Sequence, residues 1–343
     1  MFTKKRLRNN IARYLFLTGL TAPKWRSHRR LSIVTFHRVL SEAERKIYPF
    51  PGLVVTPEEL DGFLAYFSKY FDCGSLATQH ERYSNGEISG RPLLAITFDD
   101  AQYDNYSNAR FVLDRYQIKA SFFAPVMAIE QQEVLWHDLL GFSVATLLGQ
   151  SHSGQERLTR ILANSGLSGR GSRSLIENIV QASKGLALDK RLRLVEELKE
   201  ASGTIEVPSF ARLMTFEELA ELAADGHEIG SHSMTHCLMP ECDDLTLTYE
   251  IAESRSVLQT RLGQPIDSFC YPNGNSDART AEAVAKAGYL RAVTTSWGYN
   301  EQGADRFQLR RFNMNAEQVR DSSGKLMHAL IAFRMSGFYP GLN

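Results

Sequence analysis

Two adjacent carboxylates follow a short apolar run of the sequence. Residues 93–98 read Leu-Leu-Ala-Ile-Thr-Phe, and Asp99 and Asp100 come directly after them. Such a run predicts a strand that is buried on both faces, as the parallel strands of α/β proteins are. Burying a carboxylate is costly unless a cation or a proton compensates its charge. The pair therefore indicates either a charged site at the end of a buried strand or, if that end is exposed, an ordinary solvated Asp-Asp.

Two histidines about 130 residues downstream favour the first interpretation. His232 and His236 are four residues apart, and one helical turn would bring both imidazoles to the same side. Nine histidines in 343 residues would give roughly 0.2 such pairs by chance, so the spacing alone is only a hypothesis. Two imidazoles and one carboxylate are a usual ligand set for catalytic Zn²⁺, with water completing the coordination. One aspartate would then bind the ion, and the other would be left to act as a base.

Both stretches resemble known motifs. Thr-Phe-Asp-Asp, ending at Asp100, and Ser-His-Ser-Met-Thr-His, ending at His236, resemble the first two motifs of the polysaccharide deacetylases, the family of NodB-homology domains. The resemblance implies that Asp99 is the catalytic base and that the metal ligands are Asp100, His232 and His236. Apart from one long insert, it extends from about Leu31 to Asn315.

The later motifs of that family are less complete. Arg-x-Pro-Tyr would fall on residues 270–273, which read Cys-Tyr-Pro-Asn, so the arginine that braces the catalytic aspartate is expected to be absent. The surrounding Phe-x-Tyr-Pro-x-Gly resembles a variant found in many bacterial exopolysaccharide deacetylases. Asn273 takes the position whose backbone N–H helps to bind the oxyanion, and a backbone donor does not depend on its side chain.

The general acid is the second missing group. Residues 309–311 read Leu-Arg-Arg where the family has Leu-x-His. His37, at the end of the first predicted strand, is the candidate replacement, although a histidine packed in the core is an equally reasonable interpretation. His137, in Trp-His-Asp, is a weaker candidate.

About seven apolar segments alternate with helical patterns, and the polar landmarks fall at strand ends, where α/β barrels place their chemistry. The pattern predicts an α/β fold, a distorted (β/α) barrel of about seven strands over residues 31–343, and the resemblance implies the same. Helical spacing broken by Gly and Ser predicts a helical insert at about residues 136–210, a cap or lid beside the site. Thr56 and Thr215 are predicted N-caps, the first for a helix over residues 57–70.

The charge of the chain is balanced, with 39 Lys and Arg against 39 Asp and Glu, so nucleic acid is not expected as a partner. Residues 1–30 differ, because they carry basic residues and no acidic ones. Their apolar run, residues 11–20, is too short to span a bilayer, and as a signal peptide it would have a weak h-region. Two expectations stay open: a helix lying on an anionic membrane surface, or a plain helix packed on the domain.

Four cysteines without CxxC spacing favour reduced thiols. The chain is therefore expected in the cytoplasm, peripheral on the inner membrane if its N-terminal helix is interfacial; secretion is less favoured.

The expected function is metal-dependent hydrolysis of an N-acyl group, N-acetyl above all, on an amino sugar of a polysaccharide or glycan precursor. Zn²⁺ is the first choice of ion, with Co²⁺ or Ni²⁺ as alternatives. Bound there, the ion would lower the pKa of water and polarise the acyl carbonyl, while Asp99 accepts the proton. One alternative is a deformylase or deacetylase of a lipid-linked sugar at the membrane. Another is a catalytically inactive sugar-binding protein, which the missing Arg and His would favour.

Overall fold

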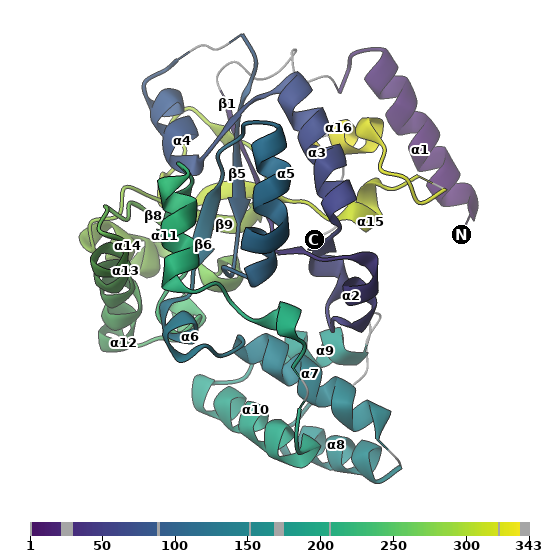
Figure 1. The fold of residues 1–343 in the computed structure, drawn as a ribbon, viewed down its shortest axis with the longest axis vertical. Helices are drawn as coiled ribbons and strands as arrows, with labels where there is room; N and C mark the ends of the chain where they lie inside the picture. The colour runs from purple at the N-terminus through teal and green to yellow at the C-terminus, as the bar shows by residue number, and fades with distance from the viewer. Residues whose placement is uncertain are drawn as a thin grey trace.

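A ring of parallel strands forms the centre of the protein, with helices around it and a group of helices at one end (Figure 1). This computed structural model describes residues 2–21, 30–87, 90–150, 152–167, 175–205, 207–321 and 323–336. In spatial order, the seven strands of the ring are β1 (Arg30–Phe36), β5 (Leu93–Phe98), β6 (Ser121–Ala124), β7 (Glu228–Ser231), β8 (Ser268–Cys270), β9 (Arg291–Trp297) and β11 (Leu309–Asn313).

The ring closes at β1, which pairs in parallel with β5 from Leu31↔Leu93 to Phe36↔Phe98 and, on its other side, with β11. Two short strands distort it. The short strand β4 pairs in parallel with the first half of β5, and β6 pairs with the end of β5 on the same side. The short strand β10 pairs antiparallel with the start of β1. The distorted barrel of about seven strands predicted from the sequence is confirmed. The strands outside the ring are β2 (Arg38–Val39), β3 (Val54–Val55), β4 (Asp72–Gly74) and β10 (Asn300–Glu301).

Helices cover the outside of the barrel. Two of them begin at the predicted threonine caps, because Thr56 and Thr215 each accept the backbone N–H of a glutamate three residues on and that glutamate bonds back to the cap. The full set of helices around the barrel is α1 (Phe2–Leu17), α2 (Glu42–Ile47), α3 (Pro57–Tyr70), α4 (Leu76–Ser84), α5 (Arg110–Arg115), α6 (Val126–Gln131), α11 (Phe216–Ala224), α12 (Asp244–Thr248), α13 (Ser254–Leu262), α14 (Ala278–Lys286), α15 (Ala316–Val319) and α16 (His328–Met335).

Alternate residues of the strands enter two different cores. In β5, Leu94, Ile96 and Phe98 belong to the large core between the barrel and its helices, whereas Leu93 and Ala95 belong to a smaller apolar core. The smaller core also holds Leu31, Ile33, Phe123, Cys270, Val293 and Leu309, which come from other strands of the ring. Successive side chains of a strand point to opposite faces, so the smaller core fills the barrel interior. This is the reason why the run 93–98 is apolar throughout.

Four helices beyond the strand ends share a hydrophobic core of their own, which includes Leu147, Leu158, Ile179 and Leu194. Figure 1 shows them grouped at the lower end of the molecule. They are α7 (Trp136–Gly149), α8 (His152–Asn164), α9 (Leu175–Ser183) and α10 (Leu188–Ser202). The Gly-Ser stretch at residues 168–174 lies outside the described residues.

The N-terminal helix α1 packs against α16. Ala12 is fully buried in this contact surface, and the Phe16 ring meets the Tyr70 ring of α3 edge-on, with 6.0 Å between centroids. Residues 22–29, which carry the rest of the basic segment, lie outside the described part of the chain. Within the described ranges, no helix has both the length and the apolar character that crossing a bilayer requires.

Three aromatic rings on the outer face of the barrel form a continuous stack that should dominate its stability. The Phe98 ring lies 5.5 Å from that of Phe36 and 5.0 Å from that of Phe122. We expect Phe98→Ala to lower the free energy of unfolding by about 3–5 kcal/mol, because it leaves a cavity among close-packed side chains. The matched control is Phe111→Ala on α5, whose ring is 61% exposed, and its cost should stay within about 0.5 kcal/mol. Urea denaturation measures both, and equal losses would contradict the assignment.

Candidate metal centre and active site

Polar side chains meet where the barrel strands end. Asp99 and Asp100 follow β5, His232 follows β7, and Cys270 is the last residue of β8. Asp99, Asp100 and His232 line a cleft of ≈ 660 Å³ between the barrel and the helices of the insert, and all three are nearly fully buried. The position agrees with the rule that α/β barrels carry their sites at the carboxyl ends of the strands.

Arg311 of β11 holds the Asp99 carboxylate inside the barrel. Its Nη1 donates to Oδ1 over 2.7 Å and its Nη2 to Oδ2 over 2.8 Å, which makes a bidentate ion pair. Nη1 also donates to the hydroxyls of Thr35 (3.0 Å) and Thr97 (3.1 Å), and Nε donates to the carbonyl of Thr294 (2.8 Å). Arg311 is 1% exposed, so the whole network is buried.

This ion pair corrects one expectation from the sequence. The bracing arginine was expected to be absent because residue 270 is Cys, but Arg311 supplies that contact from a different strand. Arg311 and Asp99 are 212 positions apart, and they meet because β11 and β5 both pair with β1. The only sequence signal was an arginine at a position where the family motif has histidine, and it was interpreted solely as the loss of an acid.

The ion pair also sets the charge of Asp99. Burial alone would raise the pKa of this carboxyl, but the nearby Arg311 charge and its hydrogen bonds outweigh burial, and the pKa is lowered. Asp99 is therefore an anion at neutral pH and can accept a proton.

Asp100 points away from its neighbour because the backbone turns sharply after β5. Asp100 (φ 73°) and Ala101 (φ 47°) both lie in the left-handed region, which non-glycine residues adopt at a cost of roughly 1–3 kcal/mol each. The turn is held by the N–H of Met214, which donates to the Ala101 carbonyl (2.8 Å). As a result, Oδ1 of Asp100 lies 3.3 Å from Nε2 of His232 and 3.3 Å from Nε2 of His236.

A loop, and not a helix, brings the two histidines together. The expectation of one helical turn is wrong, because β7 ends at Ser231 and residues 232–238 have no helical assignment. Ser233 (φ 68°) and His236 (φ 57°) are left-handed, and the Ser233 hydroxyl accepts the N–H of His236 over 3.0 Å. The imidazole centroids are nevertheless only 4.8 Å apart.

Asp100, His232 and His236 fit a divalent ion. A tetrahedral ion about 2.1 Å from each ligand would hold the ligand atoms about 3.4 Å apart, close to the two 3.3 Å separations. The tautomer of His232 also fits, since its Nδ1 lies 2.7 Å from the Cys270 carbonyl and donates to it, which leaves the Nε2 lone pair for a metal. Burying a carboxylate beside two imidazoles costs free energy, and a bound cation would offset that cost.

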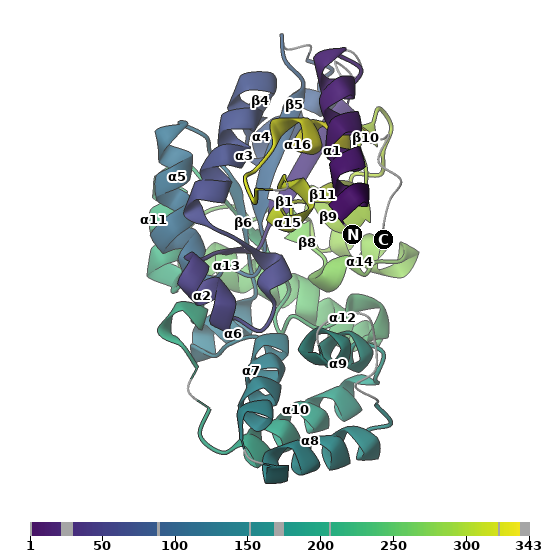
Figure 2. The same cartoon turned by 90° about the vertical axis from the view of Figure 1, so that its right-hand side faces the viewer.

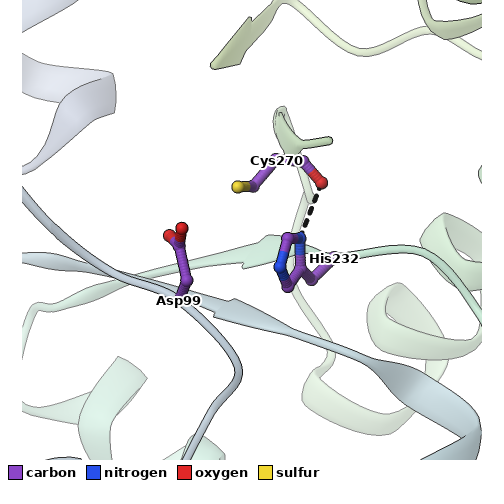
Figure 3. A group of neighbouring side chains, drawn as sticks. All are labelled: Asp99, His232 and Cys270. Atoms are coloured by element: carbon purple, nitrogen blue, oxygen red, sulfur yellow. Dashed lines mark hydrogen bonds between the residues drawn. The ribbon is translucent and has the colours of Figure 1, made fainter. Parts of the chain in front are cut away.

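A second group of potential ligands fits an ion less well. Asp99, His232 and Cys270 also place ligand atoms within 4.8 Å of one another, and Figure 3 shows the thiol and the carboxylate on the same side of the His232 ring. Each Asp99 oxygen accepts a hydrogen bond from Arg311, whose Nη2 lies 3.3 Å from the sulfur and brings a fixed positive charge to this group. Burial raises the pKa of the Cys270 thiol, which favours its neutral form. A cation here would meet the Arg311 guanidinium, so the Asp100 group is the better candidate metal site.

The two other histidines considered from the sequence lie in the same cleft. Nε2 of His37 is 3.8 Å from Oδ2 of Asp99, and its side chain is 16% exposed, so it can face a ligand. The His137 ring lies 5.3 Å from that of His236. Burial lowers the pKa of His137 to about 3, so this imidazole is neutral at neutral pH.

Asn273 lies on a tight turn at the edge of the cleft. Its φ is 56°, and Gly274 follows with φ 74°, where a Cβ would lie 2.1 Å from Oγ1 of Thr295. The Asn273 side chain is held by Nζ of Lys184, which donates to Oδ1 over 2.5 Å. Asn273 lines the same cleft as Asp99 and His232, and nothing in the sequence indicates Lys184 beside it.

Comparisons with known proteins agree with this geometry. The sequence profile described as polysaccharide deacetylase matches residues 200–292, which include both histidines. A Bacillus subtilis protein named for that family, YxkH, is 26% identical over 117 residues, 34% of this chain and 42% of YxkH, less than half of that relative. Residues 200–292 therefore resemble the polysaccharide deacetylase family, and the match includes the loop that carries both histidines.

Solved structures of deacetylases share the fold. The Streptococcus pyogenes deacetylase PplD, solved with acetate, superposes with a TM-score of 0.57 at 17% identity, over 84% of this chain and 94% of PplD. IcaB from Ammonifex degensii superposes with a TM-score of 0.52 at 16% identity, over 89% and 97%. At these identities the likeness establishes the barrel and nothing finer.

The helical insert contributes one wall of the cleft. Trp136 of α7, Glu177 and Gln181 of α9, and Lys184 just after α9 line it together with the residues at the strand ends. The sequence predicted a cap or lid beside the site but identified none of the side chains that face it. Helical periodicity marks the buried stripe of a helix, whereas these residues lie at its margin.

The buried ion pair between Arg311 and Asp99 should contribute measurably to the free energy of unfolding. We expect Arg311→Met to lower the free energy of unfolding by about 3–5 kcal/mol, because it leaves the Asp99 charge buried without a partner. The double variant Arg311→Met/Asp99→Leu should lose clearly less than the sum of the two single variants. Arg310→Met, one position away and exposed, is the matched control. Additive losses in guanidinium denaturation would show that the pair is not coupled.

Proposed function

We propose that this protein is a metal-dependent hydrolase that removes an N-acyl group, N-acetyl above all, from an amino sugar in a polysaccharide or glycan precursor. The observation that carries the proposal is Asp100 placed between His232 and His236, directly beside the Asp99–Arg311 ion pair, in one cleft. Several structural neighbours are named deacetylases, among them PplD, which was solved with acetate. Those names support the proposal by analogy of fold.

Asp100, His232 and His236 would hold the ion, with Zn²⁺ first and Co²⁺ or Ni²⁺ next by ligand type. When bound, such an ion makes water a stronger acid and polarises the acyl carbonyl. The donation from His232 Nδ1–H to the Cys270 carbonyl fixes the ring that would carry one of the ligand atoms.

The chain's own groups would then move the protons. Asp99, kept ionised by Arg311, accepts the proton of the attacking water on a carboxylate oxygen. His37, 3.8 Å from that carboxylate, donates a proton to the leaving amine nitrogen. The backbone N–H of Asn273 stabilises the developing oxyanion.

A lipid-linked amino sugar carrying a formyl or acetyl group is the alternative substrate within the same chemistry. Acetate or formate release from an acylated hexosamine oligosaccharide, compared with release from a lipid-linked acyl sugar, separates the two. The catalytically inactive sugar-binding alternative loses one of its two supports, because Arg311 supplies the bracing arginine.

Metal content tests the ligand assignment without any substrate. The purified protein should hold one divalent ion per chain, and His232→Ala should lower that stoichiometry severalfold because it removes one of three ligands. His152→Ala is the control, since its side chain is 86% exposed and distant in sequence from the ligands. Elemental analysis after dialysis provides the number, and thermal unfolding verifies that each variant is folded. Equal stoichiometric metal in wild type and His232→Ala would refute the site.

Turnover separates the roles of the adjacent aspartates. We expect Asp99→Asn to keep the ion and to lose activity by roughly 10²–10⁴-fold, because an amide cannot accept the proton. Asp100→Asn should instead weaken metal binding, with activity partly restored by added metal. Acetate release and metal content on both variants decide the matter. If only Asp99→Asn lost the ion, the roles of the two aspartates would be reversed. Full activity in both variants would contradict the deacetylase proposal.

A further inference from the structure

The side of α1 that faces away from the barrel carries large apolar side chains. Leu7, Ile11, Tyr14 and Leu17 are 62%, 44%, 66% and 77% exposed. They are spaced by four, three and three residues, so they form one stripe along the helix. We call this stripe the outer face of α1.

The opposite side of α1 already has its partner. Asn9 and Ala12 are buried, Phe16 packs on Tyr70, and Nη2 of Arg8 donates to the Arg320 carbonyl over 3.3 Å. The helix is therefore fixed to the domain through one side, and the outer face is presented without any rearrangement. Folding alone does not account for four large apolar side chains in water on one short helix.

Elsewhere, exposed apolar residues are more scattered. Phe111 on α5, Leu245 on α12 and Leu290 before β9 lie on different elements, which is normal for a protein surface. The outer face of α1 combines a continuous apolar stripe with positive charge, because Arg6 and Arg13 are exposed along one edge of the stripe; Lys5 is exposed near the start of the helix, on the other side. Residues 1–30 contain no acidic residue. A basic helix with an apolar stripe matches the two parts of an anionic bilayer surface, acyl chains below and charged headgroups above.

We propose that the outer face of α1 docks the protein on an anionic lipid surface, with the apolar stripe entering the headgroup region and the basic residues contacting lipid phosphates. One helix of this kind gives reversible binding, in contrast to a spanning segment.

The docking face and the cleft lie on the same side of the molecule. Figure 2 shows α1 towards the viewer together with α9 and α15, and residues of α9 and α15 line the cleft. A membrane bound to α1 would thus lie on the side of the molecule that carries α9 and α15, two of the helices that contribute to the cleft. If the proposed deacetylase function holds, the substrate is presented at the membrane surface, on a lipid carrier or as a glycan held there; this clause alone rests on that function.

Vesicle flotation of the full chain tests the docking. The protein should bind phosphatidylcholine vesicles that contain 30% phosphatidylglycerol, bind pure phosphatidylcholine much more weakly, and dissociate as salt rises from 0.1 to 1 M. Removing three basic side chains should weaken binding on the order of 100-fold, at about 1 kcal/mol per charge. The basic variant is Lys5→Ser/Arg6→Ser/Arg13→Ser, and the apolar variant is Leu7→Ser/Ile11→Ser/Tyr14→Ser.

Matched controls carry the same changes at exposed positions away from α1. The apolar control is Phe111→Ser/Leu245→Ser/Leu290→Ser, and the basic control is Arg115→Ser/Arg193→Ser/Lys286→Ser. Both should bind vesicles within twofold of wild type, and all variants should keep their metal content and melting temperature.

Three results would overturn the proposal: no binding by the full chain at low salt, binding that is insensitive to salt or to lipid charge, and α1 variants that bind as wild type does. A dimer in light scattering that the apolar α1 variant abolishes would assign the face to a second copy instead. Because flotation requires no turnover, its failure would leave the deacetylase proposal standing, and an inactive protein could still bind.

Discussion

The Arg311 guanidinium, on β11, contacts groups from four other strands of the barrel: Thr35 of β1, Thr97 and Asp99 at β5, Cys270 of β8 and the Thr294 carbonyl of β9. Each contact satisfies a donor that would otherwise be buried at a cost, and Asp99 neutralises the charge. The same interaction serves structure and chemistry, because a carboxylate held by a buried cation stays ionised where an isolated one would be protonated. The polar layer of the interior therefore depends on this single side chain.

Below this layer, the barrel interior is apolar, with residues such as Leu93 and Ala95, and above it the chain leaves the strands in left-handed turns. Because of these turns, residues that are adjacent in sequence lie in different environments. Asp99 faces the guanidinium, whereas Asp100 faces two imidazoles 3.3 Å away. Two identical carboxylates thus acquire different partners from the backbone alone, which is why one can act as a base and the other as a ligand.

The remaining walls of the cleft come from segments that the barrel itself does not require. The insert contributes Trp136, Glu177 and Lys184, and it is held together by its own apolar core. Residues in such a wall can change without disturbing the strands of the barrel. The N-terminal helix shows the same arrangement on the outside, with one side fixed to the domain and the other presenting apolar and basic groups.

The sequence by itself determined the barrel and the capped helices at Thr56 and Thr215, because periodicity and capping depend on short stretches of chain. It also indicated a helical insert and, by ligand type and by resemblance to known motifs, pointed to Asp99, Asp100, His232 and His236 as site residues. It could not determine contacts between distant stretches. Arg311 was interpreted as a missing histidine, since its partner lies 212 positions away and only the closure of the ring brings them together. The histidine pair was assigned to a helix, although left-handed residues in a loop make the contact. Tertiary structure alone decided these points. Which side chains meet depends on the order of the strands and on the sign of the backbone φ angle in the loops, and no local sequence pattern encodes either.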